Sequence, residues 1–491
     1  MGIIQRQGLT NAVITFIGLV IGFVSLLYIQ PKFLTPEEIG LTRVLFSVSA
    51  LVGMFLPLGI GTITLKYFPK FRNEENGHNG FLGFIALYML AGVLLMAVVL
   101  FATKGFIINQ YQQQSPLFTE YYNCVLPFSF IIGLNGILGL YCNSLFKSVL
   151  PAILNDVLLR IGSIVLFTIY FCKLISLSVF VWLFVGIYFI QGAALLLYIF
   201  SIQQVNLRAN FKMISEIGFA DMAVYGIWMS FVSVASIGIK YIDSIVIAKY
   251  YILDLVGIYT IAAFIPNVIE APLLALERIA GAKIAHAISH NQIEEVKKIY
   301  YKSSRYLLVL GGLIFIGIVV NIQFVLQLLP PAYMGGLEVV YIMSLGAIFS
   351  ILGGNNTQII FSSENFWKGG ILLIGVAVMA LFLNLLLIPR FGINGAAMAM
   401  AISSLIYTAS KFVIIYKQFR LQPYTWHTLL IVLLIAACIG LAMLFPVFTH
   451  PLLNIVTHSL AVTFIYCISI LGFRIVPEAN SIIDRYNPFV R

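Results

Sequence analysis

Charged residues are scarce in this sequence. They make up 9% of the 491 residues, whereas ordinary soluble domains carry about 25%. Hydrophobic residues make up 61%, and apolar runs of roughly 20 residues, enough to cross a bilayer core, recur along the whole length. These runs do not alternate between polar and apolar residues, which excludes a transmembrane β-barrel. The sequence therefore predicts an all-α polytopic membrane protein.

Several chemical motifs are also missing. The five cysteines form no CxxC pair, so we expect neither a disulfide framework nor a metal site. The sequence contains no GxSxG and no HExxH motif, and no stretch long and polar enough for a soluble domain. The first apolar run is too long for a cleavable signal peptide and is expected to be the first span. We therefore expect no enzyme and no cofactor.

The apolar runs divide the chain into about fourteen predicted transmembrane helices. They lie near 9–30, 43–66, 80–103, 118–141, 152–172, 176–202, 217–239, 256–282, 305–329, 337–361, 368–388, 393–416, 426–447 and 453–474. The connection after the eighth span, "NQIEEVKKIYYKSSR", has a basic face and is expected to lie along the membrane surface.

A weak internal repeat suggests two halves. "PEEIGLTRVLF" resembles "LDLVGIYTIAAF", with Gly40 matching Gly257 at an offset of 217, and "ILGLYCNSLFKS" resembles "ILGGNNTQIIFSS" at an offset of 214. Parallel repeats of this kind place a binding site between two bundles. We therefore expect one six-helix bundle in residues 1–204 and another in 205–421. Residues 422–491 would add two transmembrane helices and a short tail.

Basic residues are distributed unevenly between the two sides of the predicted spans. Of the 28 Lys and Arg residues, 19 fall on the side of the N-terminus and seven on the other. Cytoplasmic loops carry the excess of Lys and Arg, which predicts that both termini are cytoplasmic. This bias accounts for much of the net charge of +10, and no nucleic-acid partner is needed to explain it.

One apolar region is interrupted by "NLLLIPRFGINGAAMAMAIS". Pro389 is expected to end a span because it lacks a backbone donor, and Gly392 and Gly395 allow the chain to turn. The small residues that follow let helices approach closely. This stretch predicts a structural hairpin between two tightly packed spans.

Four stretches resemble one family in order and spacing: "LLIPRFGINGAA", "FLTPEEIGLTR", "KYIDSIVIAKYYILDLVGIYTIA" and "AHAISHNQIEEVKKIYYKSSR". They are similar to the polysaccharide (O-antigen or repeat-unit) flippases of the multidrug/oligosaccharidyl-lipid/polysaccharide exporter (MOP) superfamily. The resemblance covers roughly residues 5 to 440. It implies two pseudo-symmetric six-helix bundles in a V around a central cavity, plus two extra helices.

The resemblance also implies a function. Such a flippase translocates undecaprenyl-diphosphate-linked oligosaccharides across the bacterial inner membrane by alternating access, for assembly of O-antigen, capsule or exopolysaccharide. The implied partners are the lipid-linked saccharide, membrane lipids, and the polymerase and other assembly proteins, and the chain is expected to be a monomer. The related lipid II flippases carry arginines in the first span, whereas this chain has none there.

Basic residues in or beside the spans are candidate ligands for the diphosphate, because such charges are costly in a membrane. The candidates are Arg278, Arg160, Arg43 and Lys66. Arg278 resembles a basic residue found in this span in related flippases. Each candidate also has a structural alternative: Arg160 pairs with Asp156 four residues earlier, and the other three reach the membrane interface.

The acidic candidates for ion coupling or ion pairing are Asp156, Asp221, Glu270 and Glu277. Glu270 and Glu277 share a helix face, and Pro272 between them predicts a kink. These carboxylates keep open a first alternative, a cation-coupled multidrug antiporter of the same superfamily. A second alternative is a membrane-embedded polysaccharide biosynthesis enzyme, against which the lack of a catalytic motif and of a large external loop argues.

The predicted topology can be tested with alkaline phosphatase, which is active only outside the cytoplasm. A fusion after Lys173 should be active, and one after Lys298 should be inactive, because the Lys and Arg bias places these loops on opposite sides. Enzyme activity normalised to fusion abundance is the measurement. The reverse pattern would mean that the chain is inserted with its termini outside.

Overall fold

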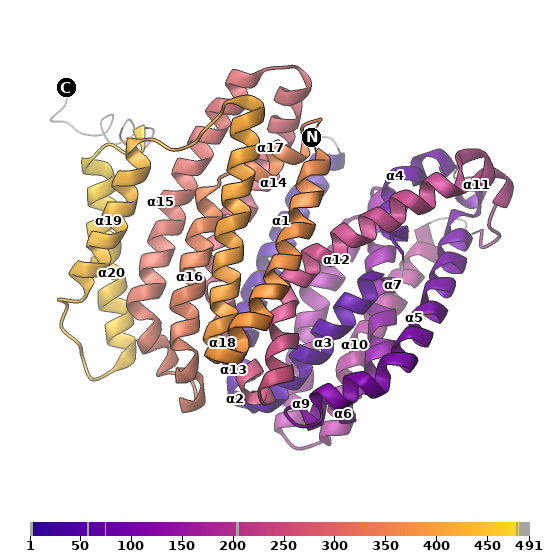
Figure 1. Ribbon diagram of the computed structural model, residues 1–491, viewed down its shortest axis with the longest axis horizontal. Coiled ribbons are helices and arrows are strands. Elements are labelled where there is room, and N and C mark those ends of the chain that lie inside the picture. Colours follow the sequence, from indigo (N-terminus) through magenta and orange to yellow (C-terminus); the bar gives the residue numbers. More distant parts are fainter. Residues whose placement is uncertain are drawn as a thin grey trace. The chain divides into compact units, whose positions relative to one another are not determined.

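The computed structural model describes residues 3–55, 58–73, 75–202, 206–364, 366–477 and 480, with backbone alone at 3–6, 9, 278 and 279. Every regular element among these residues is helical, as the sequence predicts (Figure 1). The chain divides into two units, Met1–Gly257 and Ile258–Arg491. Each unit is described by itself.

The described residues of the first unit form twelve α-helices and the start of another. They are α1 (Ile3–Val24), α2 (Gln30–Phe33), α3 (Pro36–Phe55), α4 (Ile60–Phe71), α5 (Phe81–Tyr111), α6 (Pro116–Glu120), α7 (Val125–Ser144), α8 (Val149–Ile153), α9 (Leu159–Phe171), α10 (Leu177–Ile202), α11 (Phe211–Ile217), α12 (Phe219–Tyr250) and the first turn of α13 (Leu253–Phe264). Two single π-helical turns, Ser25–Ile29 and Leu154–Leu158, continue α1 into α2 and α8 into α9.

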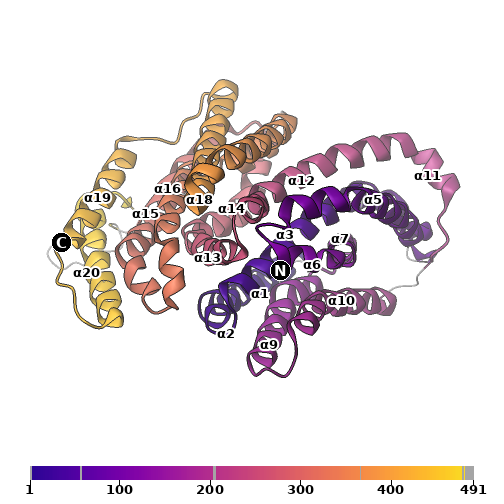
Figure 2. The same cartoon turned by 60° about the horizontal axis from the view of Figure 1, so that its bottom comes forward.

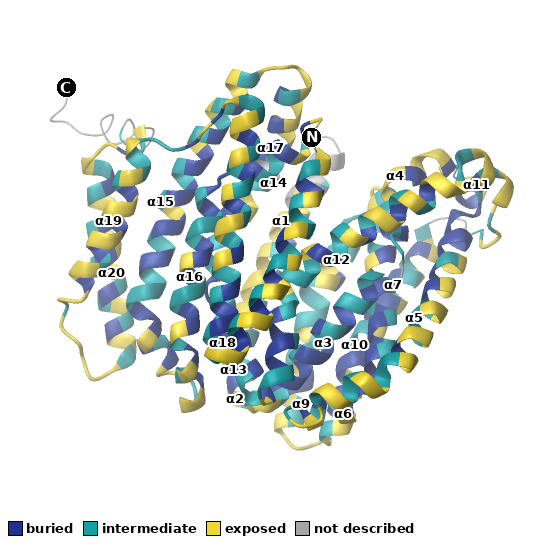
Figure 3. Cartoon of the chain, viewed as in Figure 1, coloured by how far each residue is buried: buried dark blue, intermediate teal, exposed yellow. Residues whose placement is uncertain are grey.

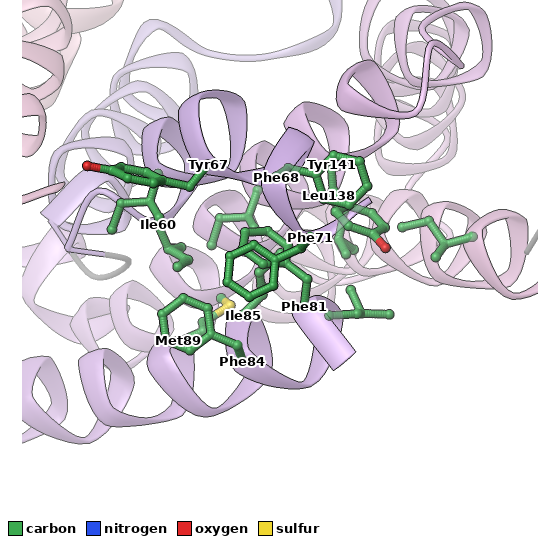
Figure 4. Close-up of a cluster of buried hydrophobic side chains, with 14 of the residues drawn as sticks. Ile60, Tyr67, Phe68, Phe71, Phe81, Phe84, Ile85, Met89, Leu138 and Tyr141 are labelled. Atoms are coloured by element: carbon green, nitrogen blue, oxygen red, sulfur yellow. The ribbon is translucent and has the colours of Figure 1, made fainter. Parts of the chain in front are cut away.

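Aromatic residues dominate one core of the first unit. Phe68 of α4 packs edge-on against Phe81 of α5 and Tyr141 of α7, with ring centroids 5.5 and 5.3 Å apart (Figure 4). Phe71 and Phe81 pack at 4.8 Å. Edge-to-face pairs at these separations add to the stabilisation that burial provides. This core holds the ends of α4, α5 and α7 together.

The two glycines that the internal repeat matches also meet in space. Gly40 and Gly257 are each the fifth residue of their helices, α3 and α13. A Cβ on Gly40 would collide with the carbonyl oxygen of Leu253, and one on Gly257 would collide with that of Pro36. The contact is reciprocal, since each glycine faces the residue four positions before the other. Only glycine permits backbones this close.

The second unit contains the remainder of α13 and seven further α-helices. They are α14 (Asn267–Ser289), α15 (Ile293–Leu326), α16 (Leu337–Leu352), α17 (Asn356–Phe361), α18 (Phe366–Phe419), α19 (Trp426–Ala442) and α20 (Pro451–Gly472). A short 3₁₀ turn, Pro331–Gly336, precedes α16. Figure 2 shows α19 and α20 beside α15, and both contact it.

Helix α18 is a hairpin of two spans. The backbone leaves the helical region at Gly392, where φ is 58° and ψ is −138°. Both arms of the hairpin contact the short helix α17. Gly369 of the first arm lies against Phe361, and Lys411 of the second arm contacts Thr357. The turn is so tight that a Cβ on Gly395 would collide with the carbonyl oxygen of Leu387.

The expected number of spans agrees with the structure. Eleven helices among the described residues are long and apolar enough to cross a membrane, and the pair α13 and α14, bent by 49°, adds a twelfth. Folding of α18 at Gly392 divides one of these helices into two, and α19 is a shorter apolar helix. Each of the fourteen predicted spans thus has a counterpart.

Two local predictions were wrong. Pro389 does not end its span; the helix continues to Gly392, where the positive φ makes the break. A 49° bend lies between α13 and α14, next to Pro266; Pro272 lies inside α14, and a kink there stays a prediction. The surface helix expected around residues 291–305 is instead the first part of α15, continuous with the following span. After Pro389, the positive φ of Gly392 makes the break three residues later. Around residues 291–305, the helix continues directly into the following span.

Exposed apolar side chains cover long stretches of several helices (Figure 3). On α5, Leu94, Val98 and Phe101 are 61%, 67% and 83% exposed. Exposing such a surface to water costs free energy, whereas exposing it to lipid does not, because lipid chains are as apolar as the side chains themselves. This pattern supports a multi-pass membrane protein.

Filling the reciprocal glycine contact should destabilise the protein. Gly40→Ala and Gly257→Ala each place a methyl group onto a backbone carbonyl, which should lower the free energy of unfolding by about 1–3 kcal/mol. Thermal unfolding in detergent would measure this. Gly105→Ala in α5 is the control, because nothing lies within 4 Å of its Cβ. An equal effect of all three changes would show that the contact is not tight.

Candidate functional site

Arg43 projects from α3 toward α12. Its Nε donates to the Ser244 hydroxyl at 3.2 Å, and its Nη2 donates to the Lys240 carbonyl at 3.5 Å. The guanidinium lies 4.8 Å from the centre of the Tyr241 ring, which also packs edge-on against Phe46 at 5.5 Å. No described carboxylate forms an ion pair with Arg43. Arg43 is thus oriented by hydrogen bonds, and the nearby Asp243 carboxylate reaches it through the Ser244 hydroxyl.

Lys66 has a similar setting on α4. Its ammonium lies 3.8 Å from the centre of the Tyr225 ring of α12 and 5.3 Å from that of Tyr67. The side chain is exposed and has no carboxylate partner among the described residues. Tyr225 and Tyr241 are 16 residues apart, which corresponds to about 24 Å along a straight helix. One helix thus presents two tyrosines, each beside an unpaired cation.

Arg160 and Asp156 both form hydrogen bonds to residues of α1. The Asp156 carboxylate accepts hydrogen bonds from the Thr15 hydroxyl and the Asn155 amide, each at 2.9 Å. The Arg160 guanidinium donates to the carbonyl oxygen of Gly18. The ion pair considered as the alternative role of these two residues is not formed.

The backbone explains why this ion pair is absent. Asp156 lies in the π-helical turn Leu154–Leu158, and such a turn changes the angular spacing on which an i, i+4 pair depends. Gly22 of α1 lies directly under the Arg160 guanidinium, where any Cβ would collide with it. Arg160 therefore has a structural role in holding α1.

Lys411 is a buried cation that is not among the candidates from the sequence. It is 7% exposed on the second arm of α18. Its ammonium donates to the Thr357 hydroxyl at 3.1 Å and lies 4.0 Å from the centre of the Tyr407 ring. A lysine placed eight residues before the end of a long apolar helix was the signal that could have identified it.

Polar groups collect around Lys411. The carboxylates of Glu277 and Glu270 on α14 act on its charge. Asn355, at the break between α16 and α17, is fully buried, and neither its amide nitrogen nor its amide oxygen has a partner among the described residues. Unpaired buried amides are costly, so a group of this kind commonly surrounds water or a bound solute.

The remaining candidates are more dispersed. Asp221 is exposed in the first turn of α12. The side chain of Arg278, the strongest candidate from the sequence, lies outside the described residues, and only its helical backbone in α14 is placed. No group of three or more His, Cys, Asp or Glu residues within the described ranges is arranged to hold a metal ion.

No protein-family model matches the chain, and no curated protein matches its sequence. Solved structures do match its fold. "Lipid II flippase MurJ, inward closed conformation" aligns with a TM-score of 0.71 and 13% identity, covering 95% of this chain and 99% of that one. An inward-facing multidrug resistance MATE family transporter of the MOP superfamily aligns at 0.64 and 13%, covering 84% and 98%. A MATE structure in complex with MaL6 aligns at 0.54 and 12%, covering 84% and 96%.

These likenesses show the fold of MOP-superfamily transporters over nearly the whole chain. At this identity they do not carry any residue's role from one protein to another. The names of these neighbours describe a flippase and a transporter. The specific polysaccharide flippase family rests on the sequence resemblance alone.

Removing Lys411 should destabilise the second unit. Lys411→Met removes the charge-assisted hydrogen bond to Thr357 and a cation that acts on Glu277, at a cost of about 2 kcal/mol of unfolding free energy. Glu277→Gln in the same chain should restore part of that loss. Thermal unfolding would test both, with Lys417→Met, an exposed lysine of the same helix, as the control. If Lys417→Met were as harmful as Lys411→Met, burial of the charge would not be the cause.

Proposed function

We propose that this protein, which has the fold of a MOP-superfamily transporter, is a flippase for undecaprenyl-diphosphate-linked oligosaccharide repeat units. It would move them across the bacterial inner membrane for assembly of a surface polysaccharide such as O-antigen, capsule or exopolysaccharide. The lipid-linked saccharide, surrounding lipids and the assembly proteins that receive the product are its proposed partners. The fold supports a transporter, and the basic residues in or beside the spans support an anionic substrate.

The proposal rests on the surroundings of two basic side chains, Arg43 and Lys66. Both belong to helices of the first unit, and both lack a carboxylate partner among the described residues. A cation in a membrane span without a counter-charge is costly unless an anion binds to it. A diphosphate is such an anion, and guanidinium and ammonium are the side chains that bind phosphate oxygens in proteins.

The aromatic rings beside these cations suit the same substrate. Tyr241 and Phe46 flank Arg43, and Tyr225 and Tyr67 flank Lys66. Aromatic side chains combine an apolar face with a polar edge, which matches a ligand that is part sugar and part lipid. A cation held over a ring also keeps its remaining donors free for an anion.

The carboxylates support the antiporter alternative less well. Asp156 is occupied by Thr15 and Asn155, and Glu277 lies near the positive charge of Lys411. A site for a cationic drug needs an acidic group whose charge is not already compensated. Arg43 and Lys66, in contrast, have no carboxylate ion-pair partner among the described residues, which favours an anionic substrate.

Transfer in liposomes tests the proposal. A fluorescent undecaprenyl-diphosphate oligosaccharide is placed in one leaflet, and its appearance in the other is followed. Arg43→Gln and Lys66→Gln should each slow transfer by about tenfold, the effect of losing one charge-assisted hydrogen bond. Arg278→Gln tests the remaining basic candidate, and Lys417→Gln, which removes an exposed charge on α18, should have no effect.

Arg160→Gln separates structure from transport. Because Arg160 contacts the backbone of α1, its loss should lower thermal stability, whereas loss of the exposed Lys66 should not. Transfer that is unchanged in every basic variant would reject the cationic site. Absence of transfer together with carboxylate-dependent expulsion of a cationic dye would instead establish the antiporter.

A further inference from the structure

A polar cavity lies in the first unit between the start of α5 and the segment before α11. Its volume is about 590 Å³. Its polar lining consists of one cation, one carboxylate and four amides: Arg208, Glu75, Asn76, Asn79, Asn206 and Asn210. None of these residues belongs to the candidate site described above. The cavity needs its own explanation.

The walls of this cavity are held by backbone contacts. A Cβ on Gly80, whose φ is +71°, would collide with the carbonyl oxygen of Arg208, and one on Gly83 would collide with that of Leu207. Three asparagines also hold the walls: Asn79 donates to the Phe71 carbonyl at 3.1 Å, and the side chains of Asn206 and Asn210 accept from backbone N–H groups. The cavity is therefore a built feature of the fold.

The opposite charges that line the cavity do not pair with each other. No ion pair joins Arg208 to Glu75, and neither side chain has another charged partner among the described residues. The amide nitrogens of Asn206 and Asn210 likewise donate to no described acceptor. One side of the cavity thus offers hydrogen-bond donors with a positive charge, and Glu75 offers a negative one. A ligand that carries a phosphate and an amine complements both.

An apolar hollow adjoins the polar cavity. It has a volume of about 330 Å³ and is lined by Phe84, Phe211, Ile214, Ser215 and Phe219. Asn210 of the cavity and Phe211 of the hollow are consecutive residues, and Figures 1 and 2 both show α11 beside the start of α5. A polar site that continues into an apolar one fits an amphiphile.

The surrounding surface has the character of a membrane interface. Leu207, Phe211 and Phe219 are 59%, 65% and 50% exposed, and the exposed Lys212 lies among them. Exposed aromatic residues next to basic ones are typical of segments at the level of lipid head groups. An amphiphile bound here would reach the cavity from the membrane.

We propose that this cavity and hollow form a binding site for a zwitterionic phospholipid with a primary amine in its head group. Arg208, with the amide nitrogens of Asn206 and Asn210, receives the phosphate, and Glu75 receives the ammonium. One acyl chain lies on Phe84, Phe211 and Phe219. The site is separate from the transported substrate and does not depend on the proposed function.

Native mass spectrometry of the full chain, released from detergent with defined lipids, tests this assignment. The wild type should retain one phosphatidylethanolamine in preference to phosphatidylglycerol, which lacks the amine. Arg208→Gln should lower retention of both lipids by about tenfold, as expected for one charge-assisted hydrogen bond. Glu75→Gln should abolish only the preference between them. Phe211→Ser should weaken both lipids through the acyl chain.

Lys298→Gln and Glu295→Gln are the matched controls, since both residues are exposed on α15, and neither should change retention. Equal retention by Arg208→Gln and the wild type would overturn the site. So would a wild-type preference for phosphatidylglycerol, or for undecaprenyl phosphate over both phospholipids. Glycerophosphoethanolamine, the head group without chains, should compete only weakly; full competition would show that the hollow holds no chain. Thermal unfolding confirms that each variant is folded.

Discussion

The absence of water in a bilayer core is the constraint on which the rest of this structure depends. Backbone polar groups must be satisfied within each span, and apolar side chains gain nothing by leaving lipid for each other. Spans therefore hold together where their backbones come close. The reciprocal contact of Gly40 with Gly257 and the tight turn at Gly395 are such places. A side chain at any of these glycines would separate two helices.

Because charges are costly where water is absent, the partners of each charged side chain indicate its role. Arg160 has a backbone carbonyl as its acceptor, and Gly22 leaves room for its guanidinium, so its charge belongs to the attachment of α1. Lys411 is buried beside a hydroxyl, a ring and two carboxylates. Arg43 and Lys66 have rings beside them and no ion-pair partner in the described part of the chain. The partners of a charge, more than its depth, distinguish a structural residue from a ligand for an anion.

Much of the fold follows from hydropathy, because a span of about 20 apolar residues needs no tertiary information to be recognised. The fourteen predicted spans all have counterparts for this reason. Local details were less predictable. Pro389 lacks a donor, but near a helix end that costs little, and the chain turned at Gly392, where positive φ was available. The π-helical turn around Asp156 left no signal in the sequence that would have excluded its pairing with Arg160.

The sequence by itself determined the helical class, the spans, and the equivalence of Gly40 and Gly257, since all three depend on local composition or on a repeat along the chain. Tertiary structure alone decided which charges are compensated. The acceptors of Arg43 lie about 200 residues away on α12, and that of Arg160 lies 142 residues away on α1. Such partners are brought together by helix packing, which no local pattern encodes. The candidate anion site is thus a property of the packed helices.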